Sequence, residues 1–364
     1  MTQSRPASAS VRKYGLAVFI GRFSPPTEAH LWVIEQGLRV ADQLLINIGS
    51  ANAPRRFDLL PFTAPEREQM IRLMLTPEQN RRVHFSHTED QGNMPKWTTL
   101  IRAAANAIQP DNKKITLVGH SKDRSSFYLK AFRGWHSTDV ENYKNLSATA
   151  FRMPYFSLGF MPQDWPSGLH AEVTNWLVDF RTTQAYQNLF EEAIDVGVTR
   201  AKYGTGPFMT GDAVVIHGDH VLMVERAKHP FRGCLAFPGG FVEDDERMLD
   251  AIFRELSEET GLKVPEQILR QNLIHTELLD APFRDPRGRI ISLAGLIYLN
   301  PTPPASMTDP KEIERYLALP RVTAGDDAKR AFWTPIADVQ REQTAFDHFM
   351  VLQNMLDQLP SGER

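Results

Sequence analysis

Apolar and polar segments alternate regularly along the first half of the chain. Four runs rich in apolar residues are typical of buried strands, at 16–21, 42–49, 82–88 and 113–120. Between them lie three segments that repeat apolar residues with the spacing of one helix face, at 30–40, 64–75 and 97–108. Strands that alternate with helices predict βαβ units. We therefore expect an α/β fold in which a doubly wound, Rossmann-like parallel sheet carries helices on both faces.

The second half follows a different rhythm. Two short apolar strands flank a His-Gly-Asp-His turn within 213–227, which predicts a hairpin. A helix is expected near 247–260, a second hairpin-like region at 284–299 and a C-terminal helix near 343–358. The segment 300–327 is rich in Pro, Asp and Thr and predicts a long surface loop.

The length of 364 residues and the different apolar patterns of the two halves predict two domains. Residues 1–13 lack apolar periodicity and predict a flexible tail. The first domain is expected over 14–190 and the second over 208–358. Between them, a helical pattern over about 185–201 gives way to glycines and a proline, so 191–207 is expected to be an interdomain linker.

Composition narrows the possible partners. With 41 Lys and Arg against 44 Asp and Glu, the net charge of −3 provides no general electrostatic reason to bind nucleic acid or an anionic membrane. The single cysteine, Cys234, cannot form an intrachain disulfide, which is typical of a reducing, cytoplasmic setting. The apolar run Leu16–Ile20 is too short for a signal peptide or a membrane span. We expect a cytoplasmic protein that binds small molecules, without nucleic-acid or membrane partners; a homo-oligomer is left open.

The strongest chemical signal is a cluster of carboxylates in the second half. Glu255, Glu258 and Glu259 are spaced i, i+3 and i+4, so a helix places all three on one face. Like charges so close repel unless a divalent cation neutralises them, and carboxylate oxygens favour Mg²⁺ or Mn²⁺. Arg254 is placed to orient a glutamate by a charged hydrogen bond, and Gly240 allows a sharp turn before the helix. The alternative is a solvated acidic helix face.

The stretch GGFVEDDERMLDAIFRELSEETGL (239–262) fills every fixed position of the Nudix box, so the second half resembles a Nudix hydrolase. The resemblance implies an α/β/α domain with a mixed sheet over about 205–358. Such domains cleave a nucleoside diphosphate linked to another moiety. The resemblance also implies that the three glutamates are catalytic, that they bind the Mg²⁺ or Mn²⁺ ion, and that Arg254 acts with them.

Two further stretches resemble ADP-ribose pyrophosphatases, one at 283–292 and one at 324–333 together with 345–348. Three arginines of the first stretch either pair with phosphates or ribose of the substrate, or belong to a charged turn: Arg284, Arg287 and Arg289. Asp326 and Asp327 in the second stretch either touch substrate or metal, or cap a helix. The sequence does not identify the general base.

In the first half, the loop GRFSPPTEAH (21–30) joins the first strand to a helix. Ligands of doubly wound sheets bind at the carboxyl ends of strands, and a helix N-terminus offers free amides to a phosphate. Thr27 and His30 are placed there to donate hydrogen bonds to an oxyanion. Downstream, Ser147 and Arg152 flank another helix start. The alternative for Thr27 and Ser147 is a plain N-cap role.

These two segments are similar to the signatures of the nucleotidyltransferase superfamily, (H/T)xGH and (I/L)SxTxxR. Within that superfamily, three stretches are similar to nicotinamide mononucleotide (NMN) adenylyltransferases, at 21–30, 61–67 and 119–129. From Tyr14 on, the chain resembles the bacterial bifunctional NMN adenylyltransferase/Nudix hydrolases. Thr27 stands where many relatives have a histidine, and Ala29 replaces the usual glycine, so we expect altered nucleotide affinity. A degenerate binding module is the alternative for this half.

The resemblance implies roles at the phosphate loop. Thr27 and His30 are expected to contact the ATP phosphates and to be catalytic. Ser147 and Arg152 are expected to hold the β- and γ-phosphates, and Mg²⁺ is expected to accompany ATP. Arg22 is expected to assist.

Other substrate contacts are expected near the strand ends. A charged group after the fourth strand either contacts the nucleotide or forms a solvated loop: Lys122, Asp123 and Arg124. Trp97 either stacks on the nicotinamide ring or packs in the core. The remaining expected contacts are Gly21, Phe23, Gly119 and Thr149.

Taken together, the resemblance implies an enzyme with two activities. The first domain is expected to transfer an adenylyl group from ATP to NMN, giving NAD and pyrophosphate. The second is expected to hydrolyse ADP-ribose to AMP and ribose 5-phosphate with Mg²⁺. The alternatives for the second domain are another substrate, such as NADH or a dinucleoside polyphosphate, or an ADP-ribose sensor that does not hydrolyse its ligand.

Overall fold

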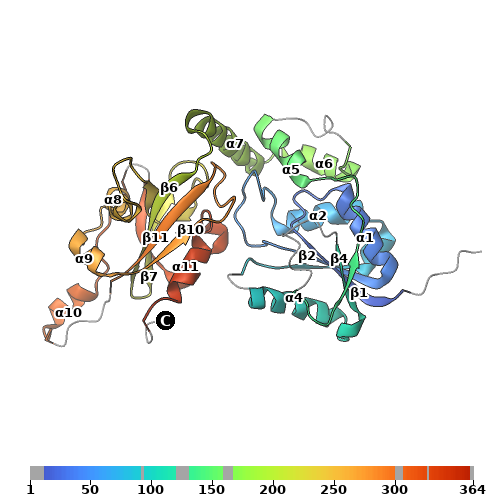
Figure 1. Ribbon diagram of the computed structural model, residues 1–364, viewed down its shortest axis with the longest axis horizontal. Coiled ribbons are helices and arrows are strands. Elements are labelled where there is room, and N and C mark those ends of the chain that lie inside the picture. The colour runs from blue at the N-terminus through green and yellow to red at the C-terminus, as the bar shows by residue number, and fades with distance from the viewer. Residues whose placement is uncertain are drawn as a thin grey trace, which may run out of the picture. The chain divides into compact units, whose positions relative to one another are not determined.

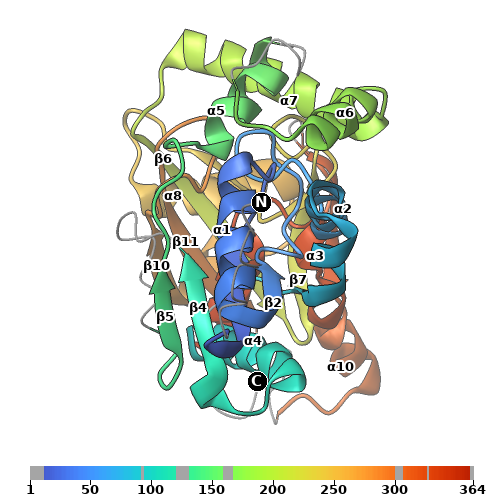
Figure 2. The ribbon, with the colours of Figure 1, turned by 90° about the vertical axis from the view of Figure 1, so that its right-hand side faces the viewer.

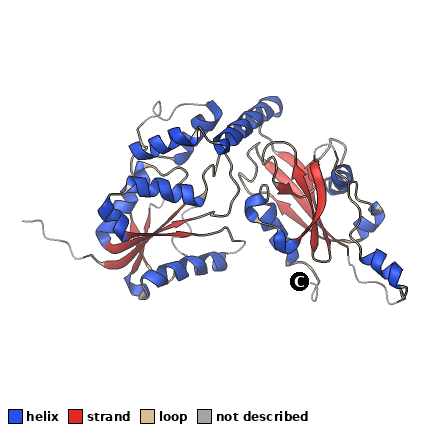
Figure 3. Ribbon diagram, turned by 180° about the vertical axis from the view of Figure 1, so that it is seen from behind, coloured by secondary structure: helices blue, strands red, loops and turns tan. Residues whose placement is uncertain are grey.

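The computed structural model describes residues 12–91, 94–119, 131–158, 167–299, 306–325 and 328–360. The chain divides into two compact units, unit 1 up to Leu189 and unit 2 from Phe190. Each unit consists of a sheet with helices on both of its faces (Figure 3). Within the described residues, no helix combines the length and apolar content that a membrane span requires.

Unit 1 contains a parallel five-stranded sheet in the order β3-β2-β1-β4-β5 (Figure 1). Its strands are β1 (Tyr14–Gly21), β2 (Ala41–Ile48), β3 (Val83–His87), β4 (Ile115–Gly119) and β5 (His136–Asp139). Its helices are α1 (Glu28–Val40), α2 (Ala64–Met74), α3 (Pro77–Arg82), α4 (Met94–Ile108), α5 (Ala148–Met153) and α6 (Ala171–Phe180). The predicted doubly wound parallel sheet is confirmed.

The continuous apolar run of β1 is explained by burial on both faces, as expected for a parallel strand. Ala17 and Phe19 belong to the core on the α1 side of the sheet. The alternate residues Leu16 and Val18 belong to the core on the α4 side. Figure 2 shows α1 along the strands that it covers. Because both faces are covered, ligands have access to this sheet at its strand ends.

Unit 2 contains a mixed sheet in the order β10-β11-β6-β7-β12, with β8 paired to β7 and β9 to β6. The strands are β6 (Phe208–His217), β7 (His220–Arg226), β8 (Leu235–Ala236), β9 (Gly239–Phe241), β10 (Leu273–Leu279), β11 (Ile290–Leu299) and β12 (Ala328–Pro335). Only β11 and β6 pair in parallel among these described strands. The helices are α8 (Met248–Thr260), α9 (Glu266–Gln271), α10 (Pro310–Leu317) and α11 (His348–Leu356).

Alternate residues of β6 face two separate cores. Ala213 and Val215 pack with α8, and Val214 and Ile216 pack with α11. This arrangement confirms the predicted α/β/α domain with a mixed sheet. The predicted hairpin is also present, since His217 pairs with His220 across a two-residue turn.

Two expected segments differ from the structure. Part of the predicted surface loop 300–327 is helix α10, which begins after Asp309, and the side chain of Asp309 accepts a hydrogen bond of 2.9 Å from the backbone N–H of Lys311. A capped start with Pro310 at the first helical position is a helix signal that the Pro-rich composition concealed. The helical pattern over 185–201 is present as α7 (Gln184–Tyr203), which continues from unit 1 into unit 2 and takes up most of the predicted linker 191–207.

Candidate active sites

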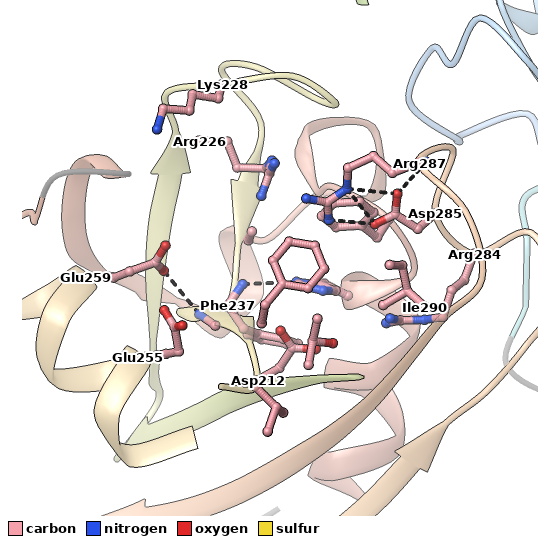
Figure 4. A pocket seen from close by; sticks show the side chains of 18 of the residues that line it. Asp212, Arg226, Lys228, Phe237, Glu255, Glu259, Arg284, Asp285, Arg287 and Ile290 are labelled. Carbon is pink, nitrogen blue, oxygen red and sulfur yellow. Dashed lines mark hydrogen bonds and ion pairs between the residues drawn. The ribbon is translucent and has the colours of Figure 1, made fainter. Parts of the chain in front are cut away.

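A pocket of about 390 Å³ opens beside α8 in unit 2. Figure 4 shows its two chemically different sides: Glu255 and Glu259 lie on one, and Arg284, Asp285 and Arg287 lie on the other. One cavity therefore has an acidic side and a basic side. The acidic side suits a bound cation, and the arginines suit an anionic ligand that binds together with that cation.

Arg254 holds the carboxylates of α8 in place. Its guanidinium donates two hydrogen bonds of 2.9 Å to Glu246, one of 2.7 Å to Glu255 and one of 3.0 Å to Glu258. The hydrogen bonds to Glu246 raise the pKa of Arg254 above its ordinary value. The prediction that Arg254 orients a glutamate is supported by these contacts, and Glu246 is the carboxylate that orients Arg254 in turn.

Backbone groups position the other glutamates. The N–H of Gly239 donates to Glu259 at 3.1 Å. A Cβ atom on Gly240 would lie 2.4 Å from Oε1 of Glu255, so only glycine allows the carboxylate to pack against the chain there. The helix ends in Gly261, whose left-handed φ of 49° suits a C-terminal cap.

The carboxylates fit a divalent cation. Burial raises the pKa of Glu255, even though Arg254 acts to lower it. A further cation beside this carboxylate would therefore stabilise its charged form. The donors are all carboxylate oxygens, which Mg²⁺ and Mn²⁺ prefer. Among the described residues, no three acidic, histidine or cysteine side chains already converge on one point, and Glu258 has a side chain 60% exposed. That all three glutamates bind one ion thus stays a prediction.

Of the three arginines considered as substrate contacts, Arg284 and Arg287 line the pocket, and each is paired with a carboxylate, whereas Arg289 is not among the lining residues. Arg284 donates to both oxygens of Asp347, at 2.9 and 2.6 Å. Burial acts to raise the pKa of Asp347, but the ion pair with Arg284 lowers it overall. Arg287 pairs with Asp285 at 2.7 Å, within the charged turn that the sequence offered as the alternative. Asp326 and Asp327 lie outside the described residues.

Several pocket residues were not predicted. Arg226 ends β7 and donates to the backbone oxygen of Pro230 at 2.8 Å, and burial lowers its pKa to about 10. Its guanidinium lies 5.0 Å from the ring centre of Phe346, another lining residue. Lys228 follows on the same loop. A charged residue at a strand end is common, so the sequence carried no distinct signal for these groups.

In unit 1, Thr27 and His30 lie together at the start of α1. The backbone N–H of Thr27 donates to Nδ1 of His30 at 2.9 Å, and the Thr27 hydroxyl lies 3.0 Å from the same nitrogen. Because Nδ1 accepts a hydrogen bond, the neutral ring carries its proton on Nε2. Phe23 is 2% exposed and packs 5.1 Å from the His30 ring, so only its backbone is available to a ligand. Gly21 packs against that Phe23 ring.

Arg152 and Arg67 stabilise the loop that carries these residues. Arg152 donates to the backbone oxygens of Ser24 and Asp58 and, at 2.9 Å, to the hydroxyl of Thr149. Arg67, which the sequence showed only as part of 61–67, donates to the carbonyls of Arg22 and Gly49 at 2.8 Å. Burial lowers the pKa of Arg67 and of Arg152 to about 10, and the charge of Arg22 acts in the same direction.

The other expected contacts in unit 1 have four different outcomes. Ser147 precedes α5 without a capping hydrogen bond from its side chain, which does not support the N-cap alternative. The Trp97 ring lies 5.8 Å from Phe132 and packs on the core of the α4 side, which supports the core alternative. Gly119 ends β4, and its carbonyl accepts from Val140 at 3.0 Å. Lys122, Asp123 and Arg124 lie outside the described residues.

Comparisons with known proteins match both units. The family model for the NUDIX domain matches residues 207–355, and the model described as cytidylyltransferase-like matches 18–152. A nicotinamide/nicotinic acid mononucleotide adenylyltransferase from Acinetobacter baylyi is 35% identical over 49% of this chain and 92% of that protein. An ADP-ribose pyrophosphatase from Methanocaldococcus jannaschii is 30% identical over 41% of this chain and 73% of that protein.

Two crystal structures from Francisella tularensis match nearly the whole chain. Both are of a bifunctional NMN adenylyltransferase/ADP ribose pyrophosphatase, one of them complexed with AMP and a Mn ion. Each is 32% identical, covers 94% of this chain and 99% of that one, and superposes with a TM-score of 0.81. The fold and sites thus define a nucleotidyltransferase unit followed by a Nudix unit. The chain belongs to the family of bifunctional NMN adenylyltransferase/ADP-ribose pyrophosphatases.

We expect Gly240→Ala to weaken metal binding in unit 2. The added Cβ would lie 2.4 Å from Glu255 and displace its carboxylate. Because Glu255 is itself an expected metal ligand, the loss of affinity should be at least the about tenfold that a change beside a metal ligand causes. Titration of the full chain with Mn²⁺ measures this, and Gly197→Ala on α7 is the control, because its Cβ meets nothing within 4 Å. Equal Mn²⁺ affinity in both variants would contradict the packing argument.

We expect Arg67→Lys to destabilise unit 1 by about 2 kcal/mol, because an ammonium cannot reach the separate carbonyls that the guanidinium spans. The free energy of unfolding is measured by denaturant titration of the full chain, with the fluorescence of the unit 1 tryptophans as the signal. Arg72→Lys is the control, since Arg72 lies on the same helix in an exposed ion pair with Glu68. A similar loss in both variants would show that the carbonyl contacts add nothing.

Proposed function

We propose that the chain is a bifunctional enzyme of NAD metabolism. Unit 1 transfers the adenylyl group of ATP to NMN, giving NAD and pyrophosphate, and unit 2 hydrolyses ADP-ribose to AMP and ribose 5-phosphate. The main support for the proposal is the similarity, over 94% of this chain, to a protein named for both activities, the bifunctional NMN adenylyltransferase/ADP ribose pyrophosphatase. We also propose that it works in the cytoplasm with Mg²⁺ as its metal.

In unit 1, the chemistry requires positioning and charge neutralisation. A phosphate oxygen of NMN attacks the α-phosphorus of ATP, and pyrophosphate leaves with the pair of electrons of the broken bond. His30 holds its proton on Nε2 and donates it in a hydrogen bond to the ATP phosphates, with the N-terminus of α1 beside it. Arg22, Arg67 and Arg152 add positive charge around the loop, and Arg152 also fixes the loop through Ser24.

In unit 2, Glu255, Glu258 and Glu259 are the residues that would hold Mg²⁺. The ion supplies charge neutralisation for the diphosphate and lowers the pKa of a bound water. Arg254 keeps Glu255 and Glu258 oriented, and the Gly239 N–H holds Glu259.

The opposite side of the pocket supplies groups that suit the rest of the substrate. Arg226, Arg284 and Arg287 present guanidinium groups for phosphates and ribose hydroxyls. The rings of Phe241 and Phe346 give apolar surface for a base or sugar. Because the Nudix box at 239–262 is complete, hydrolysis is favoured over a role as an ADP-ribose sensor. The similarity to ADP-ribose pyrophosphatases favours ADP-ribose as the substrate over NADH or a dinucleoside polyphosphate.

We expect the full chain to form NAD from NMN, ATP and Mg²⁺, and His30→Ala to slow this about 100-fold, because one charge-stabilising donor to the phosphates is lost. Chromatographic measurement of NAD and pyrophosphate tests the rate. His136→Ala, an exposed residue at the start of β5, is the control. Turnover with another acceptor but none with NMN would reject the proposed substrate.

We expect Glu258→Gln and Glu259→Gln each to lower ADP-ribose hydrolysis at least about 100-fold while the fold is retained, because a neutral amide neutralises a divalent ion poorly. Release of AMP measures the rate. Glu266→Gln is the control, since Glu266 forms an exposed ion pair with Arg270 on α9. Unchanged rates in the two α8 variants would overturn the metal-site assignment.

A further inference from the structure

The part of α7 that belongs to unit 2 contacts both loops that carry the cations of the pocket. The first, the β7–β8 loop, covers 227–234, and the second, the β10–β11 loop, covers 280–289. Arg226, at the base of the first loop, and Lys228 and His229 within it line the pocket, as do three residues of the second, Arg284, Asp285 and Arg287. The NUDIX family model begins at residue 207, after this helix.

Glu192 contacts the β7–β8 loop from α7. It is 5% exposed, and its Oε2 accepts a hydrogen bond of 3.2 Å from the backbone N–H of Phe231. The same oxygen lies 3.9 Å from Nδ1 of His229, whose side chain is also 5% exposed. Neither ring nitrogen of His229 has a hydrogen-bond partner among the described residues. Glu192 is thus the carboxylate that faces this buried imidazole at the pocket wall.

Arg200 contacts the β10–β11 loop two turns further along α7. Its guanidinium donates to the backbone oxygen of Pro286 and, at 3.2 Å, to that of Arg287. The segment after the helix adds a third contact, because the N–H of Arg289 donates to the carbonyl of Thr205 at 2.7 Å. The backbone that carries Arg287 is therefore fixed from α7 and from the residues that follow it.

We propose that Glu192 and Arg200 are positioning residues of the Nudix pocket, which set its affinity for the anionic substrate by holding the two cation-bearing loops. The proposal rests on the proposed hydrolysis of ADP-ribose in unit 2. A guanidinium binds a diphosphate well only where its donors match the oxygens, so a loop displaced by about 1 Å binds substrate less tightly. The glutamates proposed to hold the metal lie on α8, where Arg254 and the N–H of Gly239 position them.

The test uses the full chain with Arg200→Ala, Arg200→Lys and Glu192→Gln. The control is Asp195→Asn, an exposed carboxylate on the same helix. The measurements are kcat and KM for ADP-ribose at saturating Mg²⁺, AMP affinity by calorimetry, Mn²⁺ affinity, and the rate of NAD formation.

We expect Arg200→Ala to raise KM and the Kd of AMP about tenfold, with kcat within about twofold of the wild type. Arg200→Lys should restore part of the affinity, because one donor remains. Glu192→Gln should raise KM less, since its amide oxygen still accepts from Phe231. Mn²⁺ affinity and NAD formation should stay unchanged.

Two results would overturn the proposal: unchanged KM and AMP affinity in all three variants, or a loss of Mn²⁺ affinity in parallel with them, which marks general damage to unit 2. A wild-type chain that fails to hydrolyse ADP-ribose would instead reject the proposed function. In that case AMP calorimetry still tests the positioning role, because binding of AMP does not require hydrolysis.

Discussion

One guanidinium, that of Arg254, makes it possible for carboxylates to gather on α8. Glutamates one turn apart repel, and the repulsion grows where burial removes water. Arg254 bridges Glu246, Glu255 and Glu258 and so keeps the negative charges close together and oriented. Arg254 lies between these carboxylates, whereas Glu259 is held apart by a backbone amide. The carboxylates of the helix are therefore held in an arrangement that suits a cation.

The backbone around α8 is as restrictive as its side chains. A Cβ on Gly211 would lie 2.9 Å from the backbone nitrogen of Ile252, and a Cβ on Gly325 would lie 1.9 Å from the carbonyl of Glu258. The N–H of Gly325 also donates to the carbonyl of Glu259 at 2.9 Å. Strand β6 and the 323–325 segment thus approach the helix at van der Waals distance, which fixes where its carboxylates stand relative to the sheet.

The elements with strong local patterns could be predicted from the sequence, and those that depend on distant contacts could not. The continuous apolar run of β1 is typical of a buried strand, and the i, i+3, i+4 spacing of the glutamates is typical of one helix face. The strand and the helix were both predicted correctly. Helix α10 was missed because the Pro-rich composition of 300–327 concealed its capped start at Asp309 and Pro310. The contacts of Glu192 and Arg200 have no local signal, since their partners lie 39 and 87 residues further along the chain. Arg284 was expected at the site, but its partner Asp347 lies 63 residues further along the chain and became apparent only in three dimensions. The partner of Arg287 is Asp285, within the charged turn that the sequence offered as the alternative.

The way in which Arg67 and Arg152 are held in unit 1 has an electrostatic consequence. Both donate mainly to backbone carbonyls, which satisfy hydrogen bonds but carry no net charge. The charges of Asp90 and Asp58 therefore compensate these two cations only in part, since burial still lowers the pKa of both. An anion bound beside these two guanidinium groups would relieve the electrostatic cost of burying them. Binding of the proposed phosphate ligand and thermodynamic stability of unit 1 would be coupled in this way, and dissolved salt would weaken the coupling by screening.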